Sequence, residues 1–208
     1  MATLECLRWP YALLLGLATI GSYGAASYAI GVFLPAIGSD AGWRASATAL
    51  GVSLGLLGQG AIALLAGRML DTRGARTVLI PGVIFGAMFL LLASVSQEPW
   101  QFIASWAIGA SIVGGCLFYN VTMPITARLY PANRPAAYSA LTLVGALASP
   151  IFYPVAGLLI DVWGWRLAMQ GLVALMVLLA APAAFAIQTP SVERVSMQER
   201  PSTVSILR

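Results

Sequence analysis

The chain contains a series of long stretches without any charged residue, and these limit the folds it can adopt. Six such stretches follow one another along the chain, at residues 9–39, 45–67, 77–97, 99–127, 135–160 and 167–192. Each exceeds the roughly 20 apolar residues that an α-helix needs to cross the hydrocarbon core of a bilayer. None shows the alternation over about ten residues that marks a barrel strand. The pattern predicts an all-α integral membrane protein with six transmembrane helices.

The overall composition agrees with a membrane protein. Of the 208 residues, 60% are hydrophobic and only 9% are charged, whereas soluble domains carry about 25% charged residues. This balance excludes an ordinary soluble domain and a disordered chain. The first uncharged stretch, 9–39, is longer than the apolar region of a signal peptide and has no convincing cleavage site. We therefore expect it to be retained as the first helix.

The missing residue types exclude several kinds of enzyme. The chain has no His, and all 11 of its basic residues are Arg. Without Lys there is no Schiff base and no Walker-type phosphate loop, and without His there is no Ser–His dyad and no His-ligated metal or haem. Cys6 and Cys116 lie too far apart in sequence for a CxxC pair. We expect no enzyme activity, no catalytic residue, no metal site and no cofactor.

The arginines indicate how the chain is oriented in the membrane. Nine of them lie in the two tails and in the second and fourth loops: Arg8, Arg68, Arg73, Arg76, Arg128, Arg134, Arg194, Arg200 and Arg208. The other three loops hold only Arg44 and Arg166. Because basic loops stay in the cytoplasm, we expect a multi-pass protein of the plasma (inner) membrane with cytoplasmic tails at 1–8 and 189–208. Such scattered arginines favour the lipid bilayer, and not nucleic acid, as the partner.

An internal repeat relates the two parts of the predicted six-helix domain, residues 9–188. The pattern GxxxDxxGxR occurs twice, 90 residues apart, as Gly67, Asp71, Gly74 and Arg76 and as Gly157, Asp161, Gly164 and Arg166. The same offset aligns Arg44 with Arg134 and Gly55 with Gly145. Since the offset spans three helices, the second copy enters the membrane from the opposite side. We predict an inverted 3+3 repeat over about 9–97 and 99–188; chance similarity between Gly-rich helices is the alternative.

The first copy of this pattern resembles the cytoplasmic signature loop of the major facilitator superfamily. Gly67, Asp71, Gly74 and Arg76 match it, whereas Thr72 and Ala75 replace residues that are usually basic, and Arg73 keeps a charge nearby. Three other segments resemble bacterial monocarboxylate and oxalate–formate type members: Gly42-Trp43-Arg44, Tyr119-Asn120 and Gly164-Trp165-Arg166. The resemblance implies the N-terminal six-helix half of a major facilitator fold.

What this resemblance implies for function is secondary transport by alternating access. The substrate would be a small organic anion such as a monocarboxylate, and the chain would be one half of a 12-helix assembly. A second six-helix half, of the same chain type or separate, is then an expected partner, and residues 189–208 would be a cytoplasmic tail or the start of the linker between halves. The alternative is a truncated or accessory membrane subunit without transport activity of its own.

The resemblance assigns a gating role to the signature loop, which would lock one alternating-access state by bridging the two halves. Its residues are Gly67, Asp71, Arg73, Gly74 and Arg76. Asp71 is expected to accept hydrogen bonds from a neighbouring helix N-terminus, and Arg68, Arg73 or Arg76 to pair with its carboxylate or with lipid phosphates. The alternative is a basic loop that only sets orientation.

The family cavity lies between the halves near the membrane midplane and here would be lined mainly by helices one and four. The candidates are polar but uncharged: Tyr23, Ser27, Gln59, Tyr119, Asn120 and Tyr153. Their hydroxyl and amide groups would hydrogen-bond a carboxylate, although all of them also serve helix packing in other proteins. No Asp, Glu or Arg falls deep inside a span, so this half offers no evident carboxylate for proton coupling.

Overall fold

The structure is a computed structural model that describes residues 9–188. The predicted tails at 1–8 and 189–208, with Arg8, Arg194, Arg200 and Arg208, lie outside these described residues. Within them every regular element is helical: α2 (Trp9–Tyr23), η1 (Gly24–Tyr28), α3 (Ile30–Ala41), α4 (Ala45–Arg73), α5 (Arg76–Ser94), α6 (Pro99–Leu117), α7 (Tyr119–Leu129), α8 (Arg134–Ala146) and α9 (Ala148–Ala186).

Five helical segments are long and apolar enough to cross a membrane. They are Pro10–Ala41, Ala45–Arg73, Arg76–Ser94, Pro99–Leu129 and Arg134–Ala186. The last contains 53 residues, which would measure about 80 Å as one straight helix. Since the hydrocarbon core is only about 30 Å thick, this segment is too long for a single crossing.

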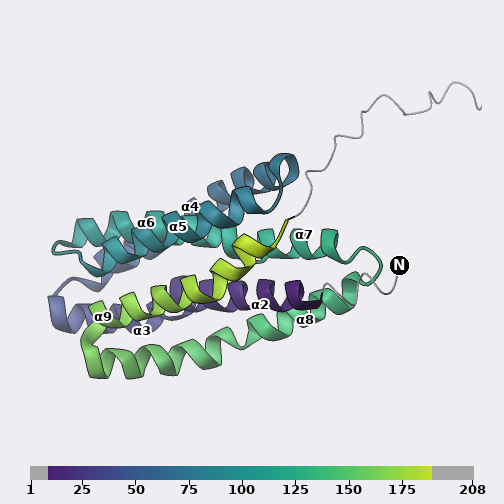
Figure 1. Cartoon of the computed structure of the whole chain (residues 1–208). Coiled ribbons are helices and arrows are strands. Elements are labelled where there is room, and N and C mark those ends of the chain that lie inside the picture. The colour runs from purple at the N-terminus through teal and green to yellow at the C-terminus, as the bar shows by residue number, and fades with distance from the viewer. Residues whose placement is uncertain (1–8, 189–208) are drawn as a thin grey trace, which may run out of the picture.

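Gly164 divides the last segment. Its backbone has φ 75° and ψ 164°, so that α9 consists of two helices, 148–163 and 165–186. The chain turns back on itself there and traverses the bundle a second time (Figure 1). Gly74, between α4 and α5, has almost the same conformation, with φ 87° and ψ 178°. This region of backbone space is open essentially to glycine alone, so both turns require it.

The helices run side by side, and their connections gather at two ends of the bundle (Figure 1). We call one the Asp71 end; it holds the α4–α5 and α7–α8 turns. The other, the Arg166 end, holds the α3–α4 and α5–α6 turns and the turn at Gly164. The helices pack through small residues, as is usual where lipid provides no hydrophobic drive for helix association.

Glycine lets α4 and α6 approach each other closely. A Cβ atom added at Gly115 would lie 2.3 Å from Ile62 Cγ2, and one at Gly58 would lie 2.1 Å from Ser111 Oγ. The Ser111 hydroxyl also donates a hydrogen bond of 3.1 Å to the Gly55 carbonyl across the two helices. Glycine therefore sets the distance between α4 and α6.

Large side chains are divided between an aromatic core and the exposed outer surface. At the Arg166 end, Phe102, Trp106 and Trp165 are almost completely buried, and Trp165 Nε1 donates a 2.8 Å hydrogen bond to Asp40 Oδ2. By contrast, Leu57 on α4 is 75% exposed. In a protein that crosses a membrane, such an outward-facing Leu contacts lipid chains at no cost in free energy.

The backbone conformation at Gly164 gives a first prediction. Gly164→Ala should destabilise the protein by about 1–3 kcal/mol, the range for a side chain forced into this region, although no atom lies within 4 Å of the new Cβ. Thermal unfolding of the purified protein in detergent measures the change.

Gly157→Ala is the matched control, because Gly157 lies within the first helix of α9 and also has no atom within 4 Å of a new Cβ. This variant should keep or slightly raise stability, since Ala favours a helix by about 1 kcal/mol over Gly. Equal unfolding temperatures for the two variants would contradict the assignment of strain to Gly164.

Candidate functional cavity

Two of the long helical segments are irregular at corresponding positions. The first contains the π-helical segment η1, where the Ala29 amide donates to the Gly24 carbonyl at 3.0 Å in an i→i+5 hydrogen bond. The fourth is interrupted at Phe118, whose extended backbone (φ −82°, ψ −177°) separates α6 from α7. Tyr28, the last π-helical residue, and Phe118 are 90 residues apart, which is the offset of the sequence repeat.

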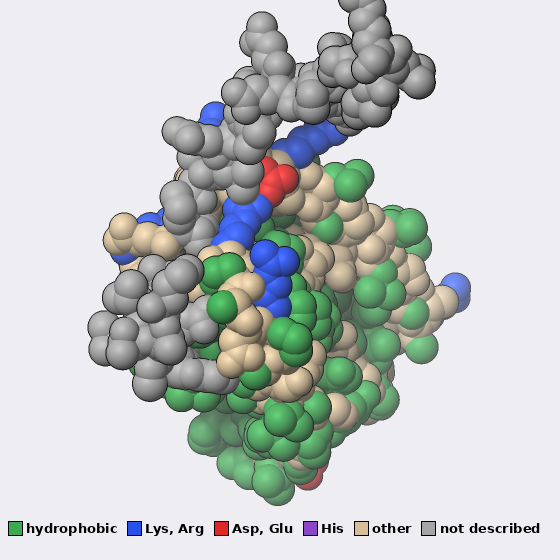
Figure 2. Space-filling view, turned by 90° about the vertical axis from the view of Figure 1, so that its right-hand side faces the viewer, with side chains coloured by type: hydrophobic (Ala, Val, Ile, Leu, Met, Phe, Trp, Pro, Cys, Tyr) green, Lys and Arg blue, Asp and Glu red, His purple; other side chains and the backbone are tan. Residues whose placement is uncertain are grey.

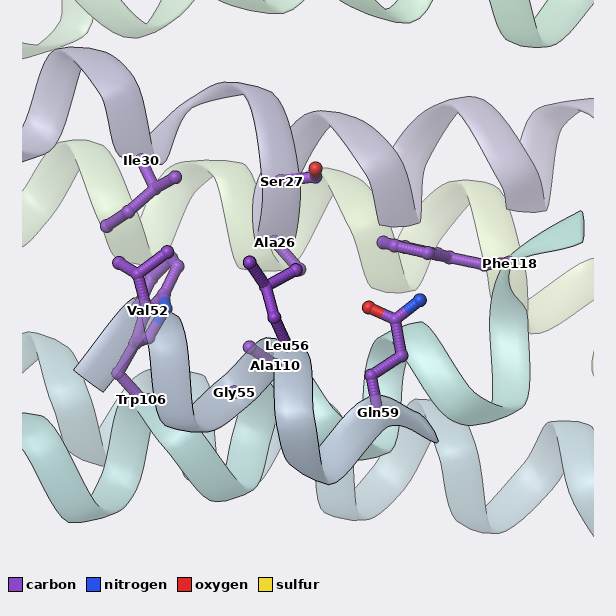
Figure 3. Close-up of a pocket in the computed structure, with 10 residues that line it drawn as sticks. All are labelled: Ala26, Ser27, Ile30, Val52, Gly55, Leu56, Gln59, Trp106, Ala110 and Phe118. Carbon is purple, nitrogen blue, oxygen red and sulfur yellow. The ribbon is translucent and has the colours of Figure 1, made fainter. Parts of the chain in front are cut away.

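A cavity of about 150 Å³ lies between these irregular segments and α4. Ten residues line it: Ala26, Ser27, Ile30, Val52, Gly55, Leu56, Gln59, Trp106, Ala110 and Phe118. Figure 3 shows the Gln59 amide beside Phe118 at one end and Ile30, Val52 and Trp106 at the other. The lining carries no charged side chain, so the cavity offers an amide and a hydroxyl group within apolar walls.

Gln59 is held in place by a glycine on the facing helix. A Cβ added at Gly114 would lie 2.6 Å from Gln59 Cδ and Oε1, so the side chain of Gln59 lies directly over the α6 backbone. Any larger residue at position 114 would displace it. The orientation of the one amide group in the cavity therefore depends on Gly114.

Aromatic rings continue from one end of the cavity. The Tyr23 ring stacks on that of Phe118, with centroids 3.7 Å apart, and lies 5.2 Å from that of Tyr119. Tyr28 lies between Tyr23, at 6.1 Å, and Tyr153, at 6.2 Å. These four tyrosines form what we call the tyrosine cluster: Tyr23, Tyr28, Tyr119 and Tyr153. It joins the first, fourth and fifth segments beside the cavity.

The six sequence candidates occupy three different positions. Ser27 and Gln59 line the cavity itself. Tyr23, Tyr119 and Tyr153 belong to the adjoining tyrosine cluster. Asn120 instead stabilises the interruption of the fourth segment. Its Nδ2 donates a 2.7 Å hydrogen bond to the Gly115 carbonyl.

Sequence reasoning missed Trp106 and Phe118, and it noted Tyr28 as a polar residue of the first helix without including it among the six candidates. Tyr28 is five residues from Tyr23, a spacing that a regular α-helix places on different faces but a π-helical turn brings together. No pattern in the sequence marks that turn. Trp106 and Phe118 resemble ordinary core residues, and only the interruption after α6 places Phe118 in the cavity wall.

The signature loop makes its contacts at the Asp71 end, which Figure 2 shows face on with basic and acidic side chains gathered together above a hydrophobic surface. Asp71 forms an ion pair with Arg128 from the last turn of α7. Arg128 Nη1 also donates to the Leu70 carbonyl at 2.9 Å. The partner of Asp71 is thus not Arg68, Arg73 or Arg76, the residues suggested by sequence proximity.

Among the described residues, Arg76 does not form an ion pair with Asp71, because Gly74 turns the chain between the two residues. Its guanidinium donates to the Phe185 carbonyl near the end of α9. At the Arg166 end, the second copy of the pattern behaves similarly: Arg166 Nη1 donates to the carbonyls of Ser94, at 3.0 Å, and Ser96, at 2.6 Å. Asp161 is exposed, and the described residues show no ion pair to it.

Comparison with known protein families identifies the family of this chain. The profile of the Major Facilitator Superfamily matches residues 15–207, which include both copies of the GxxxDxxGxR pattern and every residue that lines the cavity. Comparison with curated proteins found no matching relative. A family match that covers most of the chain, together with five apolar helical segments, leads to one conclusion: the chain belongs to the Major Facilitator Superfamily.

Proposed function

We propose that this chain transports a small organic anion, such as a monocarboxylate, as one half of a 12-helix transporter that works by alternating access. Membership of the superfamily implies secondary transport of a small molecule. The observation that carries the finer proposal is the uncharged cavity, with an amide and a hydroxyl group in its wall, between the irregular parts of the first and fourth segments. Irregular helices inside a membrane occur where they line a cavity or a substrate path.

The groups around the cavity suit a carboxylate. Gln59 and Ser27 supply an amide and a hydroxyl group within it, and the tyrosine cluster places further hydroxyl groups next to it. Hydrogen bonds from neutral donors stabilise an anion without burying a fixed cation. No charged residue lines this half of the cavity, so we propose that the second half contributes the counter-charge.

Polar groups on the outside of the bundle support pairing with a second six-helix unit. Asn120 is exposed, and Tyr153 is 44% exposed although both belong to membrane-spanning segments. Polar side chains within a membrane-spanning segment usually face protein or water, because contact with lipid leaves their hydrogen bonds unmade. In our proposal the partner, a second copy or a separate six-helix chain, covers this face and completes the cavity.

We further propose the topology of this unit. The two helices of α9 would each cross the membrane, giving six spans related as an inverted 3+3 repeat over 9–97 and 99–188. The Asp71 end, which contains most of the described arginines, would face the cytoplasm of a cell (plasma) membrane, with both tails on the same side. The signature loop there, and the Asp71–Arg128 pair with it, would hold one of the two alternating-access states.

Uptake measurements test the substrate and the assembly together. A tandem fusion of two copies, or the chain coexpressed with a six-helix product of the adjacent reading frame, should accumulate radiolabelled monocarboxylate in proteoliposomes. The single chain reconstituted at low density is the control and should show little uptake. If neither pairing transports any monocarboxylate tested, the proposed substrate class is wrong.

A second transport prediction separates the effect of Asp71 on gating from its effect on the stability of the fold. Asp71→Asn should lower the uptake rate about tenfold, which corresponds to about 1.4 kcal/mol between two conformational states. The side chain of Asp71 is 63% exposed, and exposed ion pairs contribute at most about 1 kcal/mol to folding. Thermal unfolding should therefore change little while transport falls.

Asp161→Asn is the matched control, because Asp161 has the same position in the second copy of the pattern but no ion pair among the described residues. It should transport at nearly the original rate. Unchanged uptake by Asp71→Asn, or an equal loss in both variants, would count against a gating role for the ion pair.

The tyrosine cluster gives a third transport prediction. Tyr23→Phe keeps the ring that stacks on Phe118 and removes only the hydroxyl group. If this hydroxyl contacts the substrate, the KM for uptake should rise about two- to tenfold, the value of one net hydrogen bond, with little change in maximal rate. Tyr11→Phe, on the same helix and away from the cavity lining, is the control. An unchanged KM in Tyr23→Phe would remove Tyr23 from the substrate site.

A further inference from the structure

The last arginine of each GxxxDxxGxR copy makes the same kind of contact in both copies. Arg76, at the start of α5, donates to the Phe185 carbonyl at the end of α9. Arg166, at the start of the 165–186 helix, donates to the carbonyl of Ser94, the last residue of α5, and to that of Ser96, two residues beyond it. Each arginine therefore binds the C-terminus of the helix that the other arginine begins.

The two contacts correspond to within one residue under the sequence offset. Arg76 and Arg166 are 90 residues apart, and the position 90 residues before Phe185 is 95, which lies between Ser94 and Ser96. The turns that precede the arginines also agree, with φ and ψ of 87° and 178° at Gly74 and of 75° and 164° at Gly164. The same local structure thus occurs at opposite ends of one helix pair.

The chemistry of these contacts is helix capping. The last four carbonyls of a helix lack partners within the helix, and a cation there also offsets the partial negative charge of the helix dipole. Arg166 also lies over the Trp165 ring, with its guanidinium carbon 4.3 Å from the ring centre. Gln170 adds a hydrogen bond of 3.1 Å between the same two helices, to Ser94 Oγ. Arg76 is the more exposed of the two caps.

The two caps together resist sliding of one helix along the other. α5 contains 19 residues and is about 28 Å long, and it packs against α9 with an arginine contact at each end. Sliding of either helix along the other would lengthen the contact at one end and force the other arginine past its carbonyl partners. With one cap removed, that end resists sliding less, so the contact at the other end is weakened as well.

We propose that Arg76 and Arg166 are reciprocal helix caps that fasten α5 and the 165–186 helix into one unit spanning the full depth of the bundle, so that loss of either cap loosens both ends. This inference concerns the folded bundle and does not depend on the proposed transport activity. It assigns to the last arginine of each pattern a partner in the other repeat. Asp71 also pairs across the repeats, with Arg128, but Asp161 forms no matching ion pair among the described residues.

Hydrogen exchange of the full chain in lipid nanodiscs, followed by mass spectrometry, tests this proposal. Arg166→Gln should accelerate exchange at the near end of α5, residues 91–94, about two- to tenfold, the effect of losing one net hydrogen bond. It should also accelerate exchange at the far end, residues 79–82 and 183–186. Arg76→Gln should act in the reverse direction, with smaller changes because Arg76 is more exposed.

Arg44→Gln and Arg68→Gln are controls at the two ends, since both residues are exposed and their side chains make no hydrogen bond among the described contacts. Arg166→Lys keeps the charge but loses the planar fork, and it should give intermediate exchange even if Arg166→Gln folds poorly. Acceleration confined to the mutated end would overturn the proposal, as would equal changes in the controls. Because exchange is measured without substrate, a failure of the transport proposal leaves this result unaffected.

Discussion

The structure depends on one constraint, that backbone polar groups inside a lipid bilayer find partners within the protein. Regular helices meet it automatically, so the informative places are those where a helix is irregular. At η1 the Ala29 amide reaches the Gly24 carbonyl, and at the end of α6 the Asn120 side chain reaches the Gly115 carbonyl. Each departure from regular helix is thus provided with its own hydrogen bond.

This constraint also explains where the cavity lies. An interruption that faced lipid would expose unpaired carbonyl and amide groups, whereas one that faces a cavity between helices does not. The π-helical segment and the interruption at Phe118 both contribute to the cavity wall. The position of the candidate site therefore follows from the helix geometry, and the side chains then determine its chemistry.

The sequence predicts the helical framework well and the site only partly. Charged residues mark the ends of the helical segments because they avoid the hydrocarbon, and Gly74 and Gly164 mark turns because their backbone conformation excludes other residues. The residues of η1, Gly24 to Tyr28, carry no comparable signal, since Ala and Ser fit a regular helix equally well. Pairing of Asp71 with Arg128 was not predictable either, because 57 residues separate them and only the packing of α7 beside α4 brings them together.

The close approach of α4 and α6 has a consequence for selectivity. Gln59 lies over Gly114, and the wall of the cavity that carries Gln59 stands as close to α6 as Gly58 and Gly115 allow. Gly58, Gly114 and Gly115 do not line the cavity, yet they set how closely α4, which carries Gln59, approaches α6. In a homologous chain with Ala at position 58 or 115, α4 would lie farther from α6 while the polar groups of the cavity stayed the same. The space for a solute would then change without a change in any residue that contacts it.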